Sequence, residues 1–262
     1  MNHRDTQEFQ KTGSAPVPGA GGTGKLLYFD CESGISGDMS VAALLGLGID
    51  REEFHHRLDL LGMPNCRIEI TSRRVCGTEA VDFTVHLAVR EGHHRTFGDI
   101  IDIFEKSRLS PEEKNLAVRI FRTIAEAEAA VHGVPLAKIH FHEVGAADSI
   151  IDIAAVAICV TMLRPDRIVS SRLPLGTGHI TCAHGVIPVP VPATVEIIKG
   201  VPVYQTETRG ELITPTGAAI ITNLAGSFGP MPPMTIEAAG YGAGKKKYDR
   251  TNILRVVSGI SV

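Results

Sequence analysis

The chain has 262 residues, a net charge of −3 at pH 7 and a hydrophobic content of 44%, which is typical of a globular protein that buries a sizeable core. This charge balance argues against a nucleic-acid-binding protein, because neutralising phosphates needs clustered Lys and Arg. Tryptophan is absent and aromatic residues make up only 5%, which argues against a base-stacking surface. The longest apolar run, residues 150–163, is too short to cross a membrane and contains Asp152.

The cysteines indicate a reducing compartment. They are odd in number, scattered, and never spaced as Cys-x-x-Cys, which argues against a disulfide framework or an all-cysteine zinc site. The N-terminus lacks the apolar segment of a secretory signal peptide. We therefore expect a cytoplasmic protein that binds neither membranes nor nucleic acid.

The first half of the chain predicts strands and helices in alternation. Residues 1–24 are polar and then rich in Pro and Gly, which predicts a disordered tail. The apolar segment 25–31 predicts a buried strand, and a glycine–serine turn then leads into helices at 39–47 and 51–61. Two alternating segments on either side of Gly77, residues 66–75 and 78–90, predict an antiparallel hairpin.

The second half opens with stronger helix signals. A helix is expected to begin near Thr96, and Ser-Pro-Glu-Glu at 110–113 is a capping box that opens a long helix ended by Gly133. A buried helix follows at 148–163, and the remaining residues mix short strands and helices between prolines. We predict an α/β fold with a mixed sheet, as one globular domain over 25–262. As an alternative, this domain could consist of two lobes that meet near the histidine-rich segments.

The segment HFHEVGAADSIIDI, residues 140–153, concentrates metal-ligand chemistry. His140 and His142 are two apart, so both side chains lie on one side of an extended segment. Glu143 and Asp148 add carboxylates, and imidazole beside carboxylate suits a borderline divalent metal. The alternative is that Asp148 only caps the following helix and that the histidines are solvated.

The loop after the first strand combines two carboxylates with small residues. Asp30 ends the strand, where carboxylates of α/β folds often face the ligand crevice, and Asp38 opens the next helix. The backbone of a glycine–serine loop at a helix start can bind an anion. The candidate residues for this contact are Ser33, Gly34, Ser36 and Gly37. The alternative is a plain turn in which Asp38 serves as a helix cap.

Two further segments hold donors that core burial does not explain. Arg95 can bind a phosphate or carboxylate through two hydrogen bonds. The nitrogen and sulfur donors are His93 and His94, directly before Arg95, and His179, Cys182 and His184 within one short stretch. Cys182 has a plainer alternative as an inert buried cysteine. In contrast, His55 and His56 lie within an amphipathic helix and are expected to be solvated.

Six segments in consistent order resemble the LarC family, the nickel insertion proteins of nickel-pincer nucleotide biosynthesis. They are YFDCESGISGDM (28–39), HHRTFGDI (93–100), IHFHEVGAADSIIDI (139–153), CAHGVIPVPVPATVEIIKGVPV (182–203), GELITPTGAAI (210–220) and GYGAGKKKYDRTNILRV (240–256). The resemblance implies a cytoplasmic cyclometallase, a lyase that inserts nickel into pyridinium-3,5-bisthiocarboxylic acid mononucleotide. Nickel would gain one bond to carbon and two to sulfur, with hydrolysis of CTP to CMP and pyrophosphate.

Members of the family usually continue into a C-terminal region associated with CTP and with Mn or Mg. We therefore expect CTP chemistry to need that region, supplied as a separate polypeptide partner if it is encoded separately, and we expect this chain alone to be inactive toward CTP. A homo-oligomer is also expected.

Several roles fit this chemistry. Asp30, Asp38, Glu143 and Asp148 are the candidate catalytic carboxylates, and either of the last two is placed to take the ring proton that nickel displaces. The substrate phosphate would bind the loop at 33–37 or Arg95. Two other functions remain open at this point. One is a non-catalytic nickel-delivery subunit; the other is a metal-dependent phosphohydrolase that holds Mn²⁺ or Mg²⁺.

Overall fold

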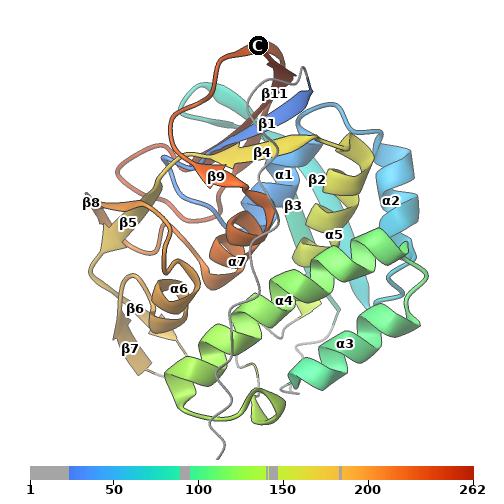
Figure 1. Cartoon of the computed structure of the whole chain (residues 1–262), viewed down its shortest axis with the longest axis vertical. Coiled ribbons are helices and arrows are strands. Elements are labelled where there is room, and N and C mark those ends of the chain that lie inside the picture. Colours follow the sequence, from blue (N-terminus) through green and yellow to red (C-terminus); the bar gives the residue numbers. More distant parts are fainter. Residues whose placement is uncertain (1–23, 89–94, 140, 142–146, 183–184) are drawn as a thin grey trace, which may run out of the picture.

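The structure, a computed structural model, describes residues 24–88, 95–139, 141, 147–182 and 185–262. Its centre is a seven-stranded sheet in the order β2-β3-β10-β11-β1-β4-β9 (Figure 1). The strands are β1 (Lys25–Asp30), β2 (Cys66–Val75), β3 (Thr78–Leu87), β4 (Arg167–Ser170), β9 (Ser227–Phe228), β10 (Met234–Ala243) and β11 (Ile253–Ser261). β1 pairs antiparallel with β11 and parallel with β4, so the predicted mixed α/β sheet is confirmed.

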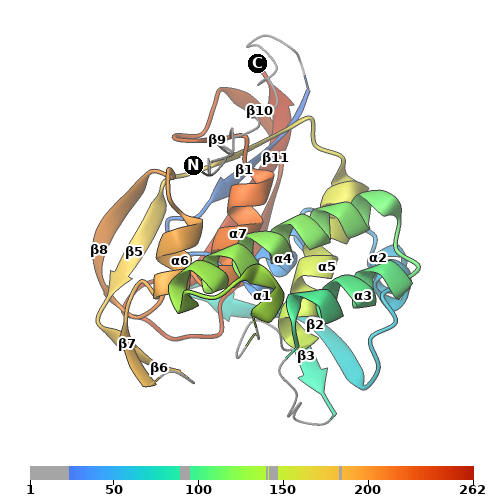
Figure 2. The same ribbon diagram turned by 60° about the horizontal axis from the view of Figure 1, so that its bottom comes forward.

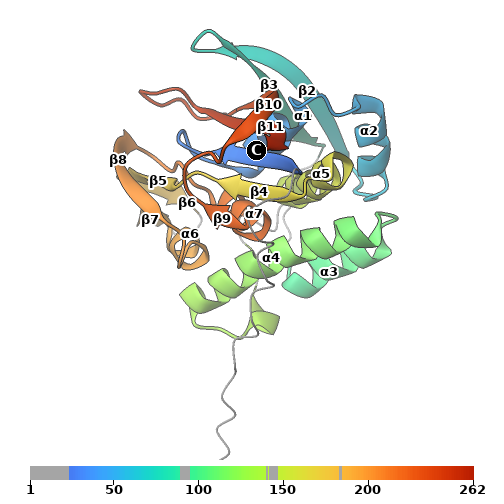
Figure 3. The same cartoon turned by 45° about the horizontal axis from the view of Figure 1, so that its top comes forward.

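Helices cover one face of the sheet in two layers. The inner layer is α1 (Gly37–Leu45), α2 (Arg51–Asp59), α5 (Ala147–Leu163) and α7 (Pro215–Leu224). The outer layer is α3 (Phe97–Lys106) and α4 (Pro111–His132), which Figure 3 shows beyond α5 and α7. α1 and α5 are apolar on nearly every side, and helices of this kind are stable only when fully covered.

α1 packs directly on β10 because two glycines of that strand leave room for the helix backbone. A Cβ at Gly242 would lie 2.1 Å from the carbonyl oxygen of Met39, and a Cβ at Gly240 would lie 2.0 Å from that of Ala43. Any larger residue would push the helix away from the sheet. This close contact holds the first turn of α1 beside the end of β10.

Local signals account for the predicted helix starts and the hairpin. Thr96 and Ser110 both form capping boxes, at the starts of α3 and α4. The hairpin β2–β3 turns at Cys76 and Gly77, which both have positive φ. Each of these predictions is confirmed, although the helix predicted at 39–47 in fact runs from Gly37 to Leu45.

The remaining elements form a small region beside the main sheet. They are β5 (Leu173–Thr177) paired with β8 (Val203–Arg209), β6 (His179–Cys182) paired with β7 (Gly185–Pro188), and α6 (Pro192–Ile197). The 3₁₀ helix η1 (Leu136–Lys138) is the exception, because it contacts α3 and α4. Figure 2 shows β5, β8, β6, β7 and α6 together at one side of the molecule. Within the parts of the chain that the structure describes, no helix has the length and apolar character needed to cross a membrane.

Candidate functional site

The loop between β1 and α1 is held by hydrogen bonds to protein acceptors. The N–H of Gly34 donates to the carbonyl of Cys31 at 2.8 Å, and that of Ile35 donates to the carbonyl of Leu212 at 2.9 Å. The Ser36 hydroxyl donates to the carboxylate of Asp38. Ser33 is partly exposed in the same loop. Because these donors are already used, the loop has fewer N–H and O–H groups left to bind an anion than the sequence suggests.

Two carboxyl groups meet at the first turn of α1. Asp38 is the second residue of that helix, and Asp152 reaches the same turn from α5. A Cβ added at Gly37 would lie only 2.4 Å from Oδ2 of Asp152, so only glycine allows this approach. With Asp148, which is one helical turn before Asp152, these residues form what we call the carboxyl cluster.

Burial and mutual repulsion change the acidity of this cluster. Burial raises the pKa of Asp152 well above its usual value, and the nearby charges of Asp38 and Asp148 raise it further. Burial also raises the pKa of Asp38, against the lowering effect of hydrogen bonds from Ser36 and the Met39 N–H. Lys245 lowers both pKa values. The result is a pair of carboxyl groups that can hold a proton more readily than an ordinary aspartate.

A small cavity of about 190 Å³ lies next to the cluster. Its charged lining residues are Asp38, Glu211, Lys245 and Lys246. Lys246 pairs with Glu211 at 3.0 Å, and Lys245 pairs with Asp82 on β3. Within the described ranges, no group of three or more His, Cys, Asp or Glu side chains is placed to hold a metal ion. The carboxyl cluster therefore combines two raised pKa values with one nearby positive charge, Lys245, which acts against the rise.

The predicted catalytic carboxylates differ in their surroundings. Asp148 is exposed in the first turn of α5, where its Oδ1 accepts a hydrogen bond from the Ser149 N–H at 2.7 Å. Glu143 lies outside the described residues. Asp152 was not among the predicted site residues. An acid within an apolar helix, four residues after Asp148 and therefore on the same face, is the sequence signal that could have identified it.

Asp30 is paired with an arginine on the neighbouring strand. Its carboxylate accepts hydrogen bonds from the Arg255 guanidinium, and the two residues are partners in the β1–β11 register. Phe29 belongs to the core under α1, whereas Tyr28 packs in a separate cluster on the other face. Side chains alternate along a strand, so Asp30 faces the same way as Tyr28. The structure therefore turns Asp30 away from Asp38.

The two main histidine segments are joined by a backbone hydrogen bond between described residues. The N–H of Phe141 donates to the carbonyl oxygen of Arg95 at 3.0 Å. The Phe141 side chain is buried, and its ring centroid lies 6.5 Å from that of Phe121 on α4. The predicted ligands His93, His94, His140, His142 and His184 lie outside the described residues.

The described donors of the fourth segment are separated by the geometry of their strand. His179 and Cys182 are the first and last residues of β6 and are three apart, so their side chains lie on opposite faces of the strand. His179 is exposed and Cys182 is partly buried. These two residues alone do not converge on one ion.

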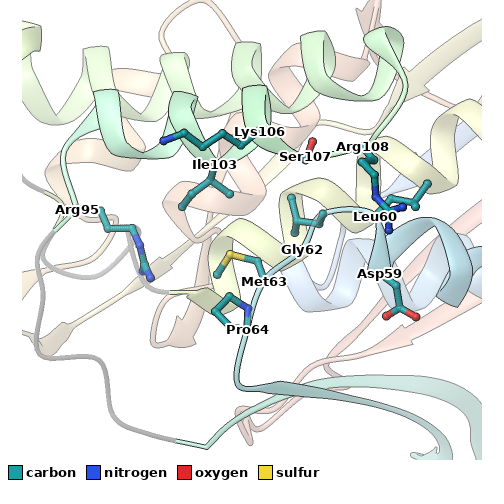
Figure 4. A pocket seen from close by; sticks show the side chains of 11 residues that line it. Asp59, Leu60, Gly62, Met63, Pro64, Arg95, Ile103, Lys106, Ser107 and Arg108 are labelled. Carbon is teal, nitrogen blue, oxygen red and sulfur yellow. The ribbon is translucent and has the colours of Figure 1, made fainter.

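Arg95 lines a second and larger cavity, of about 530 Å³, between the turn after α2 and helix α3 (Figure 4). Lys106 and Arg108 supply further positive charge to its lining. Of the two places where the sequence suggested a phosphate contact, this one carries the complementary charge. The loop at 33–37 instead lies against the carboxyl cluster.

The chain belongs to the nickel insertion protein family, which it matches over residues 27–261. This confirms the resemblance to the LarC family. Pyridinium-3,5-bisthiocarboxylic acid mononucleotide nickel insertion proteins are among its relatives: that of Geobacillus kaustophilus is 46% identical over 246 residues, and that of Acetivibrio thermocellus is 45% identical over 247 residues. Each match covers 90% of this chain and 60% of the relative, so the chain spans about 60% of the length of these relatives. No solved structure shows a significant match.

Proposed function

We propose that this chain takes part in inserting nickel into pyridinium-3,5-bisthiocarboxylic acid mononucleotide, and that it supplies the nickel ligands and the proton acceptor. Two relatives carry that substrate in their names. The observation that carries the proposal is the hydrogen bond between Phe141 and Arg95, since it joins two histidine segments that are far apart in the sequence.

The nickel site is proposed to form around that hydrogen bond. Consecutive Cα atoms are about 3.8 Å apart, so His94, His140 and His142 each adjoin a residue of the bonded pair. Imidazole nitrogens with one or two carboxylates bind Ni²⁺ and leave positions open for a second set of ligands. In this reaction nickel is a substrate, and the thiocarboxylate sulfurs of the mononucleotide would occupy the open positions.

The carboxyl cluster is proposed to accept the ring proton. When nickel bonds to a ring carbon, the C–H bond breaks and its proton must pass to a base. A base works best when its pKa lies near the working pH, and burial moves Asp152 in that direction. Asp38, beside it, is the second acceptor. Glu143 and Asp148 remain candidates for the same role, although Asp148 is exposed to solvent.

The CTP step is proposed to depend on the part of the relatives that lies outside the match. Among the described residues, the cavity beside Asp38 is small and its two lysines are offset by two carboxylates, which suits a nucleoside triphosphate poorly. We therefore assign CTP, with Mn or Mg, to the additional region of the relatives. On this proposal the 262-residue chain binds nickel but does not cleave CTP.

The test is an insertion assay on the purified chain, with and without the additional region of a relative. Mass spectrometry of the mononucleotide detects product by its nickel isotope pattern. We expect nickel binding by the chain alone, and product formation and CMP release only when both parts are present. Failure of the chain to bind nickel, or CTP cleavage by the chain alone, would contradict the proposal. Nickel binding without product in either mixture would favour the delivery-subunit alternative.

A further inference from the structure

The cavity beside Arg95 has apolar walls and charged ends. Its floor and sides come from the turn that follows α2 and from one face of α3. The apolar lining residues are Leu60, Leu61, Met63, Pro64 and Ile103. A volume of about 530 Å³ lies within the usual range for small-molecule sites, roughly 300–1,000 Å³. The space is therefore large enough for a mononucleotide.

Positive charge dominates this cavity. Arg95, Lys106 and Arg108 line it, against a single carboxylate at Asp59. In Figure 4 the side chains of Arg95 and Lys106 lie at one end of the cavity, and Arg108 and Asp59 lie at the other. Lys106 pairs with Asp102 at 3.0 Å, but both side chains are largely exposed, so this pair is weak and can yield to an anion.

We propose that this cavity binds the phosphate-bearing end of a pyridinium mononucleotide. The proposal rests on the function proposed above and names the place where its substrate is held. A guanidinium can bind two phosphate oxygens at once, which an ammonium cannot, so Arg95 gives the site its preference for phosphate, and Lys106 adds positive charge at the same end. The apolar wall around Met63 and Pro64 would pack against the ribose and the ring edge.

The position of Arg95 links this cavity to the nickel ligands. Its side chain lines the cavity, while its carbonyl oxygen accepts the hydrogen bond from Phe141. A mononucleotide bound here would therefore lie next to the hydrogen-bonded pair Arg95 and Phe141. The first turn of α1 is a poorer choice for the phosphate, because the cavity there is only about 190 Å³ and its two lysines are offset by Asp38 and Glu211.

Calorimetry with three probes tests this site. The probes are the pyridinium bisthiocarboxylate mononucleotide, the same compound without its phosphate, and inorganic phosphate. Arg95→Gln and Lys106→Gln should each raise the Kd for the mononucleotide by about tenfold, the usual effect of losing a hydrogen bond to a charged group. The affinity for the phosphate-free compound should not change. Phosphate should compete with the mononucleotide for the wild-type chain and not for Arg95→Gln.

Arg74→Gln is the matched control, since Arg74 is exposed on β2 and does not line the cavity. An unchanged Kd in both cavity variants, or an equal loss in Arg74→Gln, would overturn the proposal. Nickel titration of the same variants separates the two proposals. Nickel affinity should stay unchanged in Lys106→Gln, because Lys106 is not adjacent in the sequence to any proposed nickel ligand. If the wild-type chain binds no nickel but the cavity variants still bind the mononucleotide more weakly than the wild type does, the proposed nickel site is wrong and the proposed phosphate site stands.

Discussion

The backbone N–H of Phe141 donates to the carbonyl oxygen of Arg95 at 3.0 Å, and this hydrogen bond joins two segments of the sequence that carry most of the candidate histidine ligands. Burial of the Phe141 ring against Phe121 anchors the contact to α4. The rest of the proposed site follows from it. α5 begins shortly after residue 141 and carries Asp152 to the first turn of α1.

Asp152→Asn should abolish most nickel insertion without lowering stability at neutral pH. The pKa of Asp152 is higher in the folded chain than in the unfolded chain, so the folded state binds more protons. The stability that this provides is complete below the unfolded pKa and is lost as the pH rises through the folded pKa. Unfolding by urea, from about pH 4 to pH 8, should show a shallower decline in the variant than in the wild type.

Asp148→Asn is the control for that experiment, because the residue is exposed on the same helix and Asn serves nearly as well as Asp near a helix start. It should change the pH profile of unfolding far less than Asp152→Asn does, because burial contributes more than the charge of Asp148 to the raised pKa of Asp152, and it should leave the insertion rate nearly unchanged. If Asp152→Asn kept full insertion activity, the proton-acceptor role would have to pass to Asp38 or Glu143.

Gly37→Ala should destabilise the chain and impair insertion. Alanine normally favours a helix over glycine by up to about 1 kcal/mol, but here its Cβ would lie 2.4 Å from Oδ2 of Asp152. Gly98→Ala in the first turn of α3 is the matched comparison, since the nearest atom to its Cβ would be 3.6 Å away. Thermal unfolding should show a lower midpoint for Gly37→Ala and an equal or higher one for Gly98→Ala. A stabilising Gly37→Ala would refute the close approach of α5 to α1.

Asp30→Asn should mainly affect stability. The carboxylate pairs with Arg255, whose side chain is half exposed, so the pair contributes about 1 kcal/mol or less. Arg255→Gln should cause a similar loss, and the double variant should lose little more than either single one, which a double-mutant cycle measures. Insertion should continue in all three. Loss of insertion in Asp30→Asn, with unchanged unfolding, would restore the catalytic role that the sequence suggested.

Much of the fold could be predicted from the sequence because its signals are local. The capping boxes at Thr96 and Ser110 and the turn at Gly77 each depend on a few neighbouring residues, and all three are present in the structure. The segment at 148–163 has almost no polar face, which predicted correctly that helix α5 is buried.

The site was harder to predict because it depends on long-range pairing. Asp30 pairs with Arg255, which lies on a strand near the other end of the chain, and nothing near Asp30 in the sequence indicates this pairing. In the sequence Asp152 is an isolated acid within an apolar helix. Its proximity to Asp38 depends on how α5 packs against the first turn of α1. The choice between the loop at 33–37 and Arg95 as the phosphate contact needed the charges around each, which only the packing provides.

Nickel titration by calorimetry tests the central claim, that the segments joined by Arg95 and Phe141 form the nickel site. The variant is His140→Ala with His142→Ala. Its control is His55→Ala with His56→Ala, two exposed histidines on α2 that match the first pair in number and residue type. The account predicts that the first pair of substitutions weakens nickel binding by at least about tenfold, equivalent to 1.4 kcal/mol, whereas the second pair leaves it unchanged. Equal nickel affinity in the two double variants would contradict it.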